Sequence, residues 1–312
     1  MSSPTKEQTV KALSRGPIYP IPPAFKNGVL DRAEILRYTN YLHDNGAKTI
    51  LTTAGTSRFN LLTTDEVRQL NFSVSLFPGR KIVGLQPLAD VHLANELNAM
   101  NSLDADAVLL FYPDRYYDDE TIVNYFHKAA DISPLPVLIH GMFMRHALGG
   151  MYNFQQELVV KLMGHPNIVG MKEESSTYSL AYKISSLANK EFLIFPAGGS
   201  CRRYLLTGPS GAQTFLGGIG NIFPKIEETF FREFKFGDKN TAYKIVTDFE
   251  ESLFDVFSKI GWHKALQEAL NYKKLLVTEN RAPFSLMTND EDKEAIHNVL
   301  DTIELRWETY YG

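Results

Sequence analysis

The chain has 312 residues, of which 44% are hydrophobic and 22% charged, and it carries a formal charge of −4. The near balance of 32 basic and 36 acidic residues argues against a broad nucleic-acid-binding surface. No apolar run reaches the ~18 residues that span a bilayer, and the first 15 residues lack the apolar stretch of a secretory signal. Cys201 is the only cysteine, so no internal disulfide is expected. We therefore expect a cytoplasmic protein with neither a membrane nor a nucleic-acid partner.

Short apolar runs alternate with longer amphipathic segments along most of the chain. Such runs are typical of parallel strands that are buried on both faces. Eight repeats favour an α/β fold closed into a (β/α)8 TIM barrel, although a doubly wound open sheet has the same local pattern. The predicted strands are residues 18–24, 49–53, 81–85, 107–111, 136–140, 168–171, 192–195 and 213–216.

Helix signals follow the first two strands. Asp31 is a suitable N-cap, Asn45-Gly46 is a suitable stop, and Thr63-Thr64 followed by two acidic residues opens the next helix. From about residue 240 the strand pattern disappears, and apolar residues recur at helical spacing. We expect an N-terminal tail (1–16), a barrel (17–236) and a C-terminal helical extension (237–312).

Several motifs of other enzyme classes are absent from the sequence. The chain has no G-x-x-x-x-G-K-[ST] phosphate loop, no G-x-G-x-x-G after the first strand, no H-E-x-x-H and no G-x-S-x-G. The eight histidines are scattered singly, so no metal site is expected.

Lys172 follows directly after the predicted sixth strand. In a barrel, chemistry takes place where the strands end, and burial there lowers the pKa of an amine. A neutral amine is the nucleophile that forms Schiff bases with ketones. The alternative is a lysine that extends to solvent or pairs with Glu173 or Glu174.

The residues around Lys172 raise the weight of the catalytic interpretation. Residues 167–176, N-I-V-G-M-K-E-E-S-S, resemble the Schiff-base lysine segment of the dihydrodipicolinate synthase / N-acetylneuraminate lyase family. Residues 216–224, L-G-G-I-G-N-I-F-P, are similar to its eighth-strand pattern I-S-G-x-A-N-x-x-P. Residues 22–31 and 281–283 are similar to its opening T-P-F…G-x-x-D and its late R-x-P.

The resemblance implies a fold and a chemistry. The family are class I, pyruvate-type lyases on a (β/α)8 barrel with a C-terminal helical extension, and they assemble as tetramers or dimers. The amine attacks C2 of a 2-oxo acid, and the resulting iminium withdraws electrons, so neither a metal nor an organic cofactor is required. We expect a homo-oligomer that binds a small 2-oxo acid as its substrate.

The family's carboxylate-binding loop, G-[ST]-T-G-E, aligns with residues 54–58, A-G-T-S-R. Gly55, Thr56 and Ser57 can still bind a carboxylate through backbone N–H groups and hydroxyls, or they form an ordinary turn. Arg58 replaces glutamate; it binds a second anionic group, pairs with an acid or lies in solvent.

The family's proton-relay tyrosine aligns with His140. An imidazole is a competent acid or base near neutral pH, but a buried histidine in a protein that has lost activity is also consistent with this position. Arg145 keeps the position of an arginine that binds a substrate carboxylate in synthase members. Tyr116 is a replacement relay or part of an aromatic subunit interface, and Leu216 completes the expected substrate contacts.

The sequence therefore predicts a Schiff-base lyase, an aldolase or hydro-lyase, acting on pyruvate or a 2-keto-3-deoxy sugar acid through an iminium on Lys172. The alternative is a catalytically silent member of the family that acts as a binding or regulatory protein.

Overall fold

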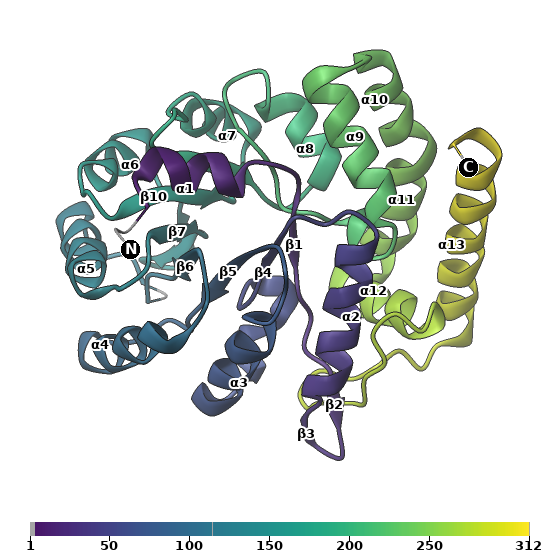
Figure 1. The fold of residues 1–312 in the computed structure, drawn as a ribbon, viewed down its shortest axis with the longest axis horizontal. Coiled ribbons are helices and arrows are strands. Elements are labelled where there is room, and N and C mark those ends of the chain that lie inside the picture. Colours follow the sequence, from purple (N-terminus) through teal and green to yellow (C-terminus); the bar gives the residue numbers. More distant parts are fainter. Residues whose placement is uncertain (1–3, 114, 312) are drawn as a thin grey trace.

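A ring of parallel strands forms the centre of the molecule. The computed structural model describes residues 4–113 and 115–311 (Figure 1). Its main sheet has the order β1-β4-β5-β6-β7-β10-β11, and every neighbouring pair is parallel. The strands are β1 (Ile18–Pro20), β4 (Thr49–Leu51), β5 (Arg80–Gly84), β6 (Ala107–Leu110), β7 (Val137–Gly141), β10 (Ile168–Glu173) and β11 (Leu193–Pro196).

The predicted eighth strand closes the ring, although only one isolated bridge, Ile18 to Leu216, is strand-like there. On one side, the Leu216 N–H donates to Pro196 O at 2.9 Å. On the other, the Gly217 N–H donates to Ile18 O at 2.8 Å, and the Ile18 N–H donates to Phe215 O at 2.9 Å. Residues 213–217 thus join β11 to β1. The (β/α)8 barrel is confirmed, and the open sheet is not.

Helices surround the ring and connect its strands (Figure 1). The expected N-caps are present, because the Asp31 carboxylate accepts from Glu34 N–H at 3.1 Å and Thr63 forms a capping box with Glu66. The helices are α2 (Arg32–Asp44), α3 (Thr64–Val74), α4 (Asp90–Ala99), α5 (Asp119–Ile132), α6 (Gln156–Met163), α7 (Tyr178–Ser185), α8 (Ser200–Thr207) and α9 (Pro224–Phe236).

The barrel interior has its own apolar cluster, separate from the cluster between strands and helices. It includes Leu51, Ile82 and Leu138, one from each of three strands. The N-terminal segment, for which the sequence predicts no element, contains helix α1 (Lys6–Leu13), and Val10 and Leu13 of that helix belong to the same cluster. Helix α1 therefore packs apolar side chains against the interior.

Two short hairpins interrupt the strand–helix alternation. The strands β2 (Phe25–Lys26) and β3 (Val29–Leu30) are joined by an Asn-Gly turn, in which both residues have positive φ. The second hairpin consists of β8 (Met144–His146) and β9 (Gly150–Tyr152). Neither hairpin is among the elements predicted from the sequence, although Asn-Gly is a common signal for such a turn.

The C-terminal residues form helices, as predicted. One buried face includes Ala242, Phe249 and Leu253, and the last helix buries Ile296 and Leu300. None of the helices in the described ranges is long and apolar enough to cross a membrane. The elements are α10 (Lys239–Ile245), a π-helical turn η5 (Val246–Glu250), α11 (Glu251–Ile260), α12 (Trp262–Tyr272) and α13 (Asp290–Tyr311), the outermost helix in Figure 1.

Candidate active site

Lys172 and His140 are neighbours because their strands are paired. The parallel register places Lys172 of β10 opposite His140 of β7. Lys172 Nζ lies 2.7 Å from His140 Nε2 and 3.0 Å from Glu174 Oε2, and the latter two atoms are 2.5 Å apart. Lys172 is only 1% exposed. The ring of Phe111 lies 4.2 Å from the imidazole, between centroids. An amine, an imidazole and a carboxylate therefore meet in a largely apolar environment.

Burial and mutual interactions shift the pKa values of Lys172, His140 and Glu174. Burial lowers the pKa of Lys172, and the attraction of Glu174 opposes this shift only in part. Burial, followed by the nearby Lys172, lowers the pKa of His140 to about 4. Burial alone would raise the pKa of Glu174, but Lys172 and His140 outweigh it and lower the pKa. At neutral pH the imidazole is uncharged and Glu174 is a carboxylate.

Lys172 faces a cavity of about 340 Å³. This volume lies at the lower end of the range for small-molecule sites, roughly 300–1,000 Å³. Besides Lys172 and Glu174, the wall of this cavity comes from the loops after β4 and β11, from the segment around residues 216–218 that closes the barrel, and from α11 and α12. The lining residues are Gly55, Thr56, Lys172, Glu174, Gly198, Gly199, Ser200, Leu216, Gly217, Gly218, Phe254, Ser258, Trp262 and His263.

The loop after β4 contributes part of the predicted carboxylate site. It forms a 3₁₀ turn over Gly55–Ser57, and Gly55 and Thr56 line the cavity. Ser57 is buried and is not among the lining residues. The N–H groups of Ser57 and Arg58 donate to Ala54 O and Gly55 O, both at 2.9 Å, so these two donors close the turn. Gly55 and Thr56 are therefore the residues of this loop that line the cavity.

Arg58 is buried, and no acid of the described ranges pairs with it. It is 5% exposed, donates to Pro23 O at 3.3 Å and to the side-chain carbonyl of Gln267, and lies 4.3 Å from the ring of Phe284. Burial lowers its pKa to about 10. Arg58 therefore joins the loop after β4 to the C-terminal helices. Burial, and then repulsion from Arg58, also lower the pKa of His263 in the cavity wall.

Tyr116 and Arg145 lie outside this cavity, whereas Leu216 lines it. Tyr116 stacks on Tyr152 of the second hairpin with centroids 3.7 Å apart, and both hydroxyls donate to Asp119, at 3.3 and 2.7 Å. The Arg145 carbonyl of the same hairpin accepts from the Tyr116 N–H at 2.9 Å. The structure thus brings these two residues together, but away from Lys172.

Several cavity residues are missing from the sequence-based prediction. Gly199 and Ser200 follow a predicted strand, so their position at a strand end was the signal that would have found them. Phe254, Trp262 and His263 come from the C-terminal helices, and their place in the wall depends on how the extension packs. No local pattern in the sequence indicates it.

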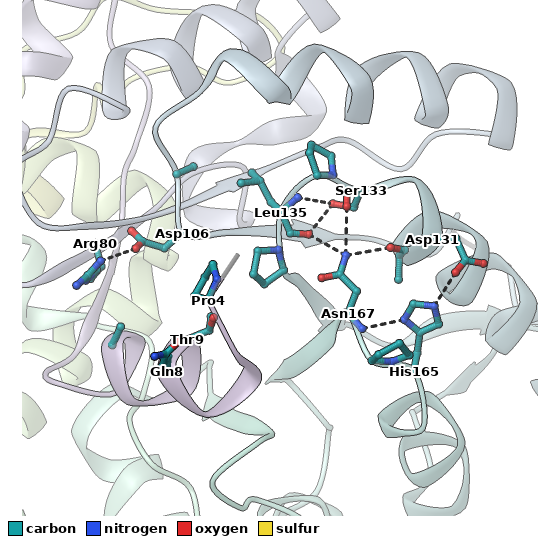
Figure 2. Close-up of a pocket in the computed structure, with 16 residues that line it drawn as sticks. Pro4, Gln8, Thr9, Arg80, Asp106, Asp131, Ser133, Leu135, His165 and Asn167 are labelled. Atoms are coloured by element: carbon teal, nitrogen blue, oxygen red, sulfur yellow. Dashed lines mark hydrogen bonds and ion pairs between the residues drawn. The ribbon is translucent and has the colours of Figure 1, made fainter. Parts of the chain in front are cut away.

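A second cavity, of about 740 Å³, lies at the other end of the strands, beside α1 (Figure 2). Its polar side chains bind one another or the backbone: Arg80 pairs with Asp106 at 2.8 Å, and His165 pairs with Asp131 at 3.0 Å. The Asn167 amide donates to three backbone carbonyls. Catalytic groups of such barrels lie at the carboxyl ends of the strands, so we assign the active site to the Lys172 cavity.

The chain is thus a (β/α)8-barrel protein with a buried lysine at the carboxyl end of its sixth strand, where the catalytic groups of such barrels lie. A family model described as the dihydrodipicolinate synthetase family matches residues 18–303. The chain belongs to this family, and it is a Schiff-base-forming lyase of the class I aldolase type.

Curated relatives and solved structures agree with this placement. The chain is 27% identical to the 4-hydroxy-tetrahydrodipicolinate synthase of Ligilactobacillus salivarius over 265 residues, 82% of this chain and 87% of the relative. It is 29% identical over 141 residues, 44% of each chain, to a "probable 4-hydroxy-2-oxoglutarate aldolase, mitochondrial" of Emericella nidulans. The dihydrodipicolinate synthase structure from Agrobacterium tumefaciens has a TM-score of 0.80 at 20% identity, covering 95% of this chain and 99% of that one. These relatives do not favour a silent paralogue.

Proposed function

We propose that Lys172 is the nucleophile of this lyase and that its substrate is a 2-oxo acid, such as pyruvate or a 2-keto-3-deoxy sugar acid. One observation carries the proposal: the Lys172 amine is buried, lies at the wall of a cavity and has a lowered pKa. Attack on a carbonyl requires the neutral amine, and burial increases its fraction at neutral pH. The name of one relative, a probable 4-hydroxy-2-oxoglutarate aldolase, contains a 2-oxo acid and supports the same substrate class.

In the proposed reaction, Nζ adds to C2 of the oxo acid and the carbinolamine loses water to give an iminium. The electron pair of a C3–H or C3–C4 bond then moves toward the iminium nitrogen and forms a neutral enamine. Glu174, which remains a carboxylate 3.0 Å from Nζ, stabilises the iminium cation. When the C3–C4 bond breaks, His140 takes the proton of the C4 hydroxyl, which becomes the carbonyl of the departing fragment, because its uncharged Nε2 lies next to the reacting nitrogen. When the C3–H bond breaks, the C3 proton passes to a basic side chain of the cavity wall.

The carboxylate of the substrate is assigned to the Gly55–Thr56 side of the cavity. The Gly55 backbone and the Thr56 side chain supply hydrogen-bond donors there, and no carboxylate other than Glu174 lines the described cavity. Arg145, Tyr116 and Ser57 are not among the residues that line the described cavity, and this assignment does not use them.

Borohydride trapping tests the proposal. The protein is incubated with pyruvate and a panel of other 2-oxo acids, reduced, and weighed intact. Wild type should gain the mass of the reduced adduct, and Lys172→Met should gain none. Lys81→Met is the matched control, because Lys81 is also a buried strand lysine, 7% exposed and paired with Asp104 at 2.7 Å, and it should be trapped like wild type. No adduct across the panel, or an adduct that survives in Lys172→Met, would refute the assignment.

The oligomeric state, the location and the domain limits are also proposals. The family resemblance supports a homo-oligomer, a dimer or tetramer, in the cytoplasm. Light scattering tests the first of these, and a mass equal to the 35.3 kDa chain would contradict it. The barrel at 17–236 and the extension at 237–312 are proposed as one folding unit, since Arg58 of the barrel binds Gln267 of the extension.

A further inference from the structure

A buried carboxyl group lies directly behind the wall of the Lys172 cavity. Ser200, at the start of α8, lines this cavity. Its hydroxyl donates to Glu227 Oε1 of α9 at 2.6 Å, and the Gly218 N–H donates to the same oxygen at 2.6 Å. Glu227 is fully buried, with 0% exposure. One hydroxyl therefore connects a buried acid to the space that the substrate occupies.

The glycine loop between the cavity and α9 has room for this acid because it lacks side chains. A Cβ at Gly217 would lie 2.7 Å from Glu227 Oε2, and a Cβ at Gly220 would lie 2.3 Å from the same atom. The eighth-strand pattern to which this loop is similar, I-S-G-x-A-N-x-x-P, has Ser and Ala at these two positions. The carboxyl group thus occupies space that depends on both glycines.

The backbone of Ser200 is held in an uncommon conformation. Its φ is +46°, in the left-handed region that residues other than glycine rarely adopt. A second buried acid, Glu250 of η5, accepts the N–H groups of Cys201 at 3.0 Å and Arg202 at 2.8 Å, so it holds the first turn of α8. Strained residues that the surroundings over-determine are frequent at functional sites. The strain here aims the Ser200 hydroxyl at Glu227.

Burial favours the protonated form of both acids. Burial raises the pKa of Glu227, and the hydrogen bonds from Ser200 and Gly218 offset this only in part. Burial, and then repulsion from Glu227, raises the pKa of Glu250 to about 8. The other titratable groups that face Glu227 are Cys201 of α8, Tyr19 of β1, Tyr38 of α2 and Glu228 of α9.

We propose that Ser200 is a catalytic residue that delivers a proton to C3 of the enamine, and that Glu227 is the positioning residue that resupplies it. The proposal rests on the proposed Schiff base at Lys172. The enamine electron pair forms the new C3–H bond with the Ser200 hydroxyl proton, and the nitrogen becomes an iminium. Ser200 takes the carboxyl proton of Glu227 in the same step, which leaves a carboxylate that accepts the hydrogen bond of the Ser200 hydroxyl, the arrangement in the structure. The reverse step moves a C3 proton of the iminium to Ser200 and the hydroxyl proton to Glu227, and solvent exchanges the carboxyl proton.

Deuterium exchange into the methyl group of pyruvate, followed by NMR in D₂O, measures this step without a second substrate. Ser200→Ala and Glu227→Gln should each lower the exchange rate at least tenfold, while borohydride trapping of pyruvate remains at the wild-type level. The double variant should lose no more than either single variant, because the two residues act as one unit. Glu228→Gln is the matched control: Glu228 is the next residue of α9, its pKa is raised to about 7 and it binds Tyr19, and it should exchange at the wild-type rate.

The pH profile separates a proton-transfer role from a structural one. In wild type, exchange per trapped imine should rise as pH rises and Glu227 becomes a carboxylate, because removal of the C3 proton through Ser200 needs that base, and Glu227→Gln should lack this ascending limb. If Glu227→Gln were trapped and exchanged deuterium at the wild-type rate, the relay alone would be overturned. The same would follow if the losses in exchange rate of the two single variants multiplied in the double variant. Failure of wild type to form any adduct would instead overturn the Schiff base and the relay with it.

Discussion

The ion pair next to Lys172 allows a quantitative prediction. Glu173 follows Lys172 on β10 and is fully buried. Arg203 of α8 donates to both of its carboxylate oxygens, at 3.0 and 2.7 Å from one nitrogen and 3.2 Å from another, and also to Ser175 O at 2.9 Å. The Ser175 N–H, at 2.7 Å, and the Ser175 hydroxyl are the further donors to Glu173. Arg203 is therefore the charge that compensates this carboxylate.

Arg203→Met removes that compensation and leaves a buried carboxylate. Breaking a buried pair from one side costs about 3–5 kcal/mol, a large share of a typical free energy of unfolding of roughly 5–15 kcal/mol. Urea unfolding at pH 7, followed by circular dichroism, measures the loss. Changing Glu173 to Gln in the same chain should restore a large part of it, because no charge is then left unpaired.

Arg232→Met is the control for this experiment. The Arg232 side chain is 64% exposed and pairs with Glu233 at 3.0 Å, and exposed pairs contribute about 0–1 kcal/mol. If Arg203→Met were no more destabilised than this control, the Glu173–Arg203 pair would be solvated, and the dry environment inferred for this end of β10 would be wrong.

Three further predictions concern the cavity. His140→Phe should still be trapped by borohydride but turn over about 10²–10⁴-fold more slowly; unchanged rates would make His140 a bystander. The His140 ring should titrate near pH 4 by NMR. Because the unfolded state binds its proton near pH 6.5, the free energy of unfolding should fall by up to about 3 kcal/mol as the pH is lowered from 6.5 to 4. His140→Phe should lack this pH dependence. Thr56→Val should raise KM for the oxo acid about fivefold, by roughly one hydrogen bond, with kcat and trapping at saturation preserved; an unchanged KM would move the carboxylate elsewhere.

The barrel and its central lysine could be predicted because their signals are local. Each strand is a short apolar run, and Lys172 follows one of them directly. Adjacent parallel strands then place His140 beside Lys172 without further information. The eighth strand was also predicted, although in the structure its hydrogen bonds, rather than an extended strand, define it.

The rest of the site depends on contacts between distant segments. Arg58 lies in a loop that looks solvent-exposed in the sequence, and only the packing of Gln267 and Phe284 against it explains its burial. Tyr116 is near strand four in sequence, but stacking on Tyr152 of an unpredicted hairpin draws it away from the cavity. Glu227 has no local signal, because a glutamate on an amphipathic helix is usually exposed.

The ionisation of the Lys172 amine is the most direct test of the whole account. The pH dependence of reductive labelling by pyruvate and cyanoborohydride, resolved by peptide mass spectrometry, yields its pKa. Because burial lowers the pKa of Lys172, we predict labelling of this residue that levels off well below the ordinary lysine pKa of about 10.4. A Lys172 profile that keeps rising up to this ordinary value would contradict the account, because the amine would then be charged and solvated at neutral pH.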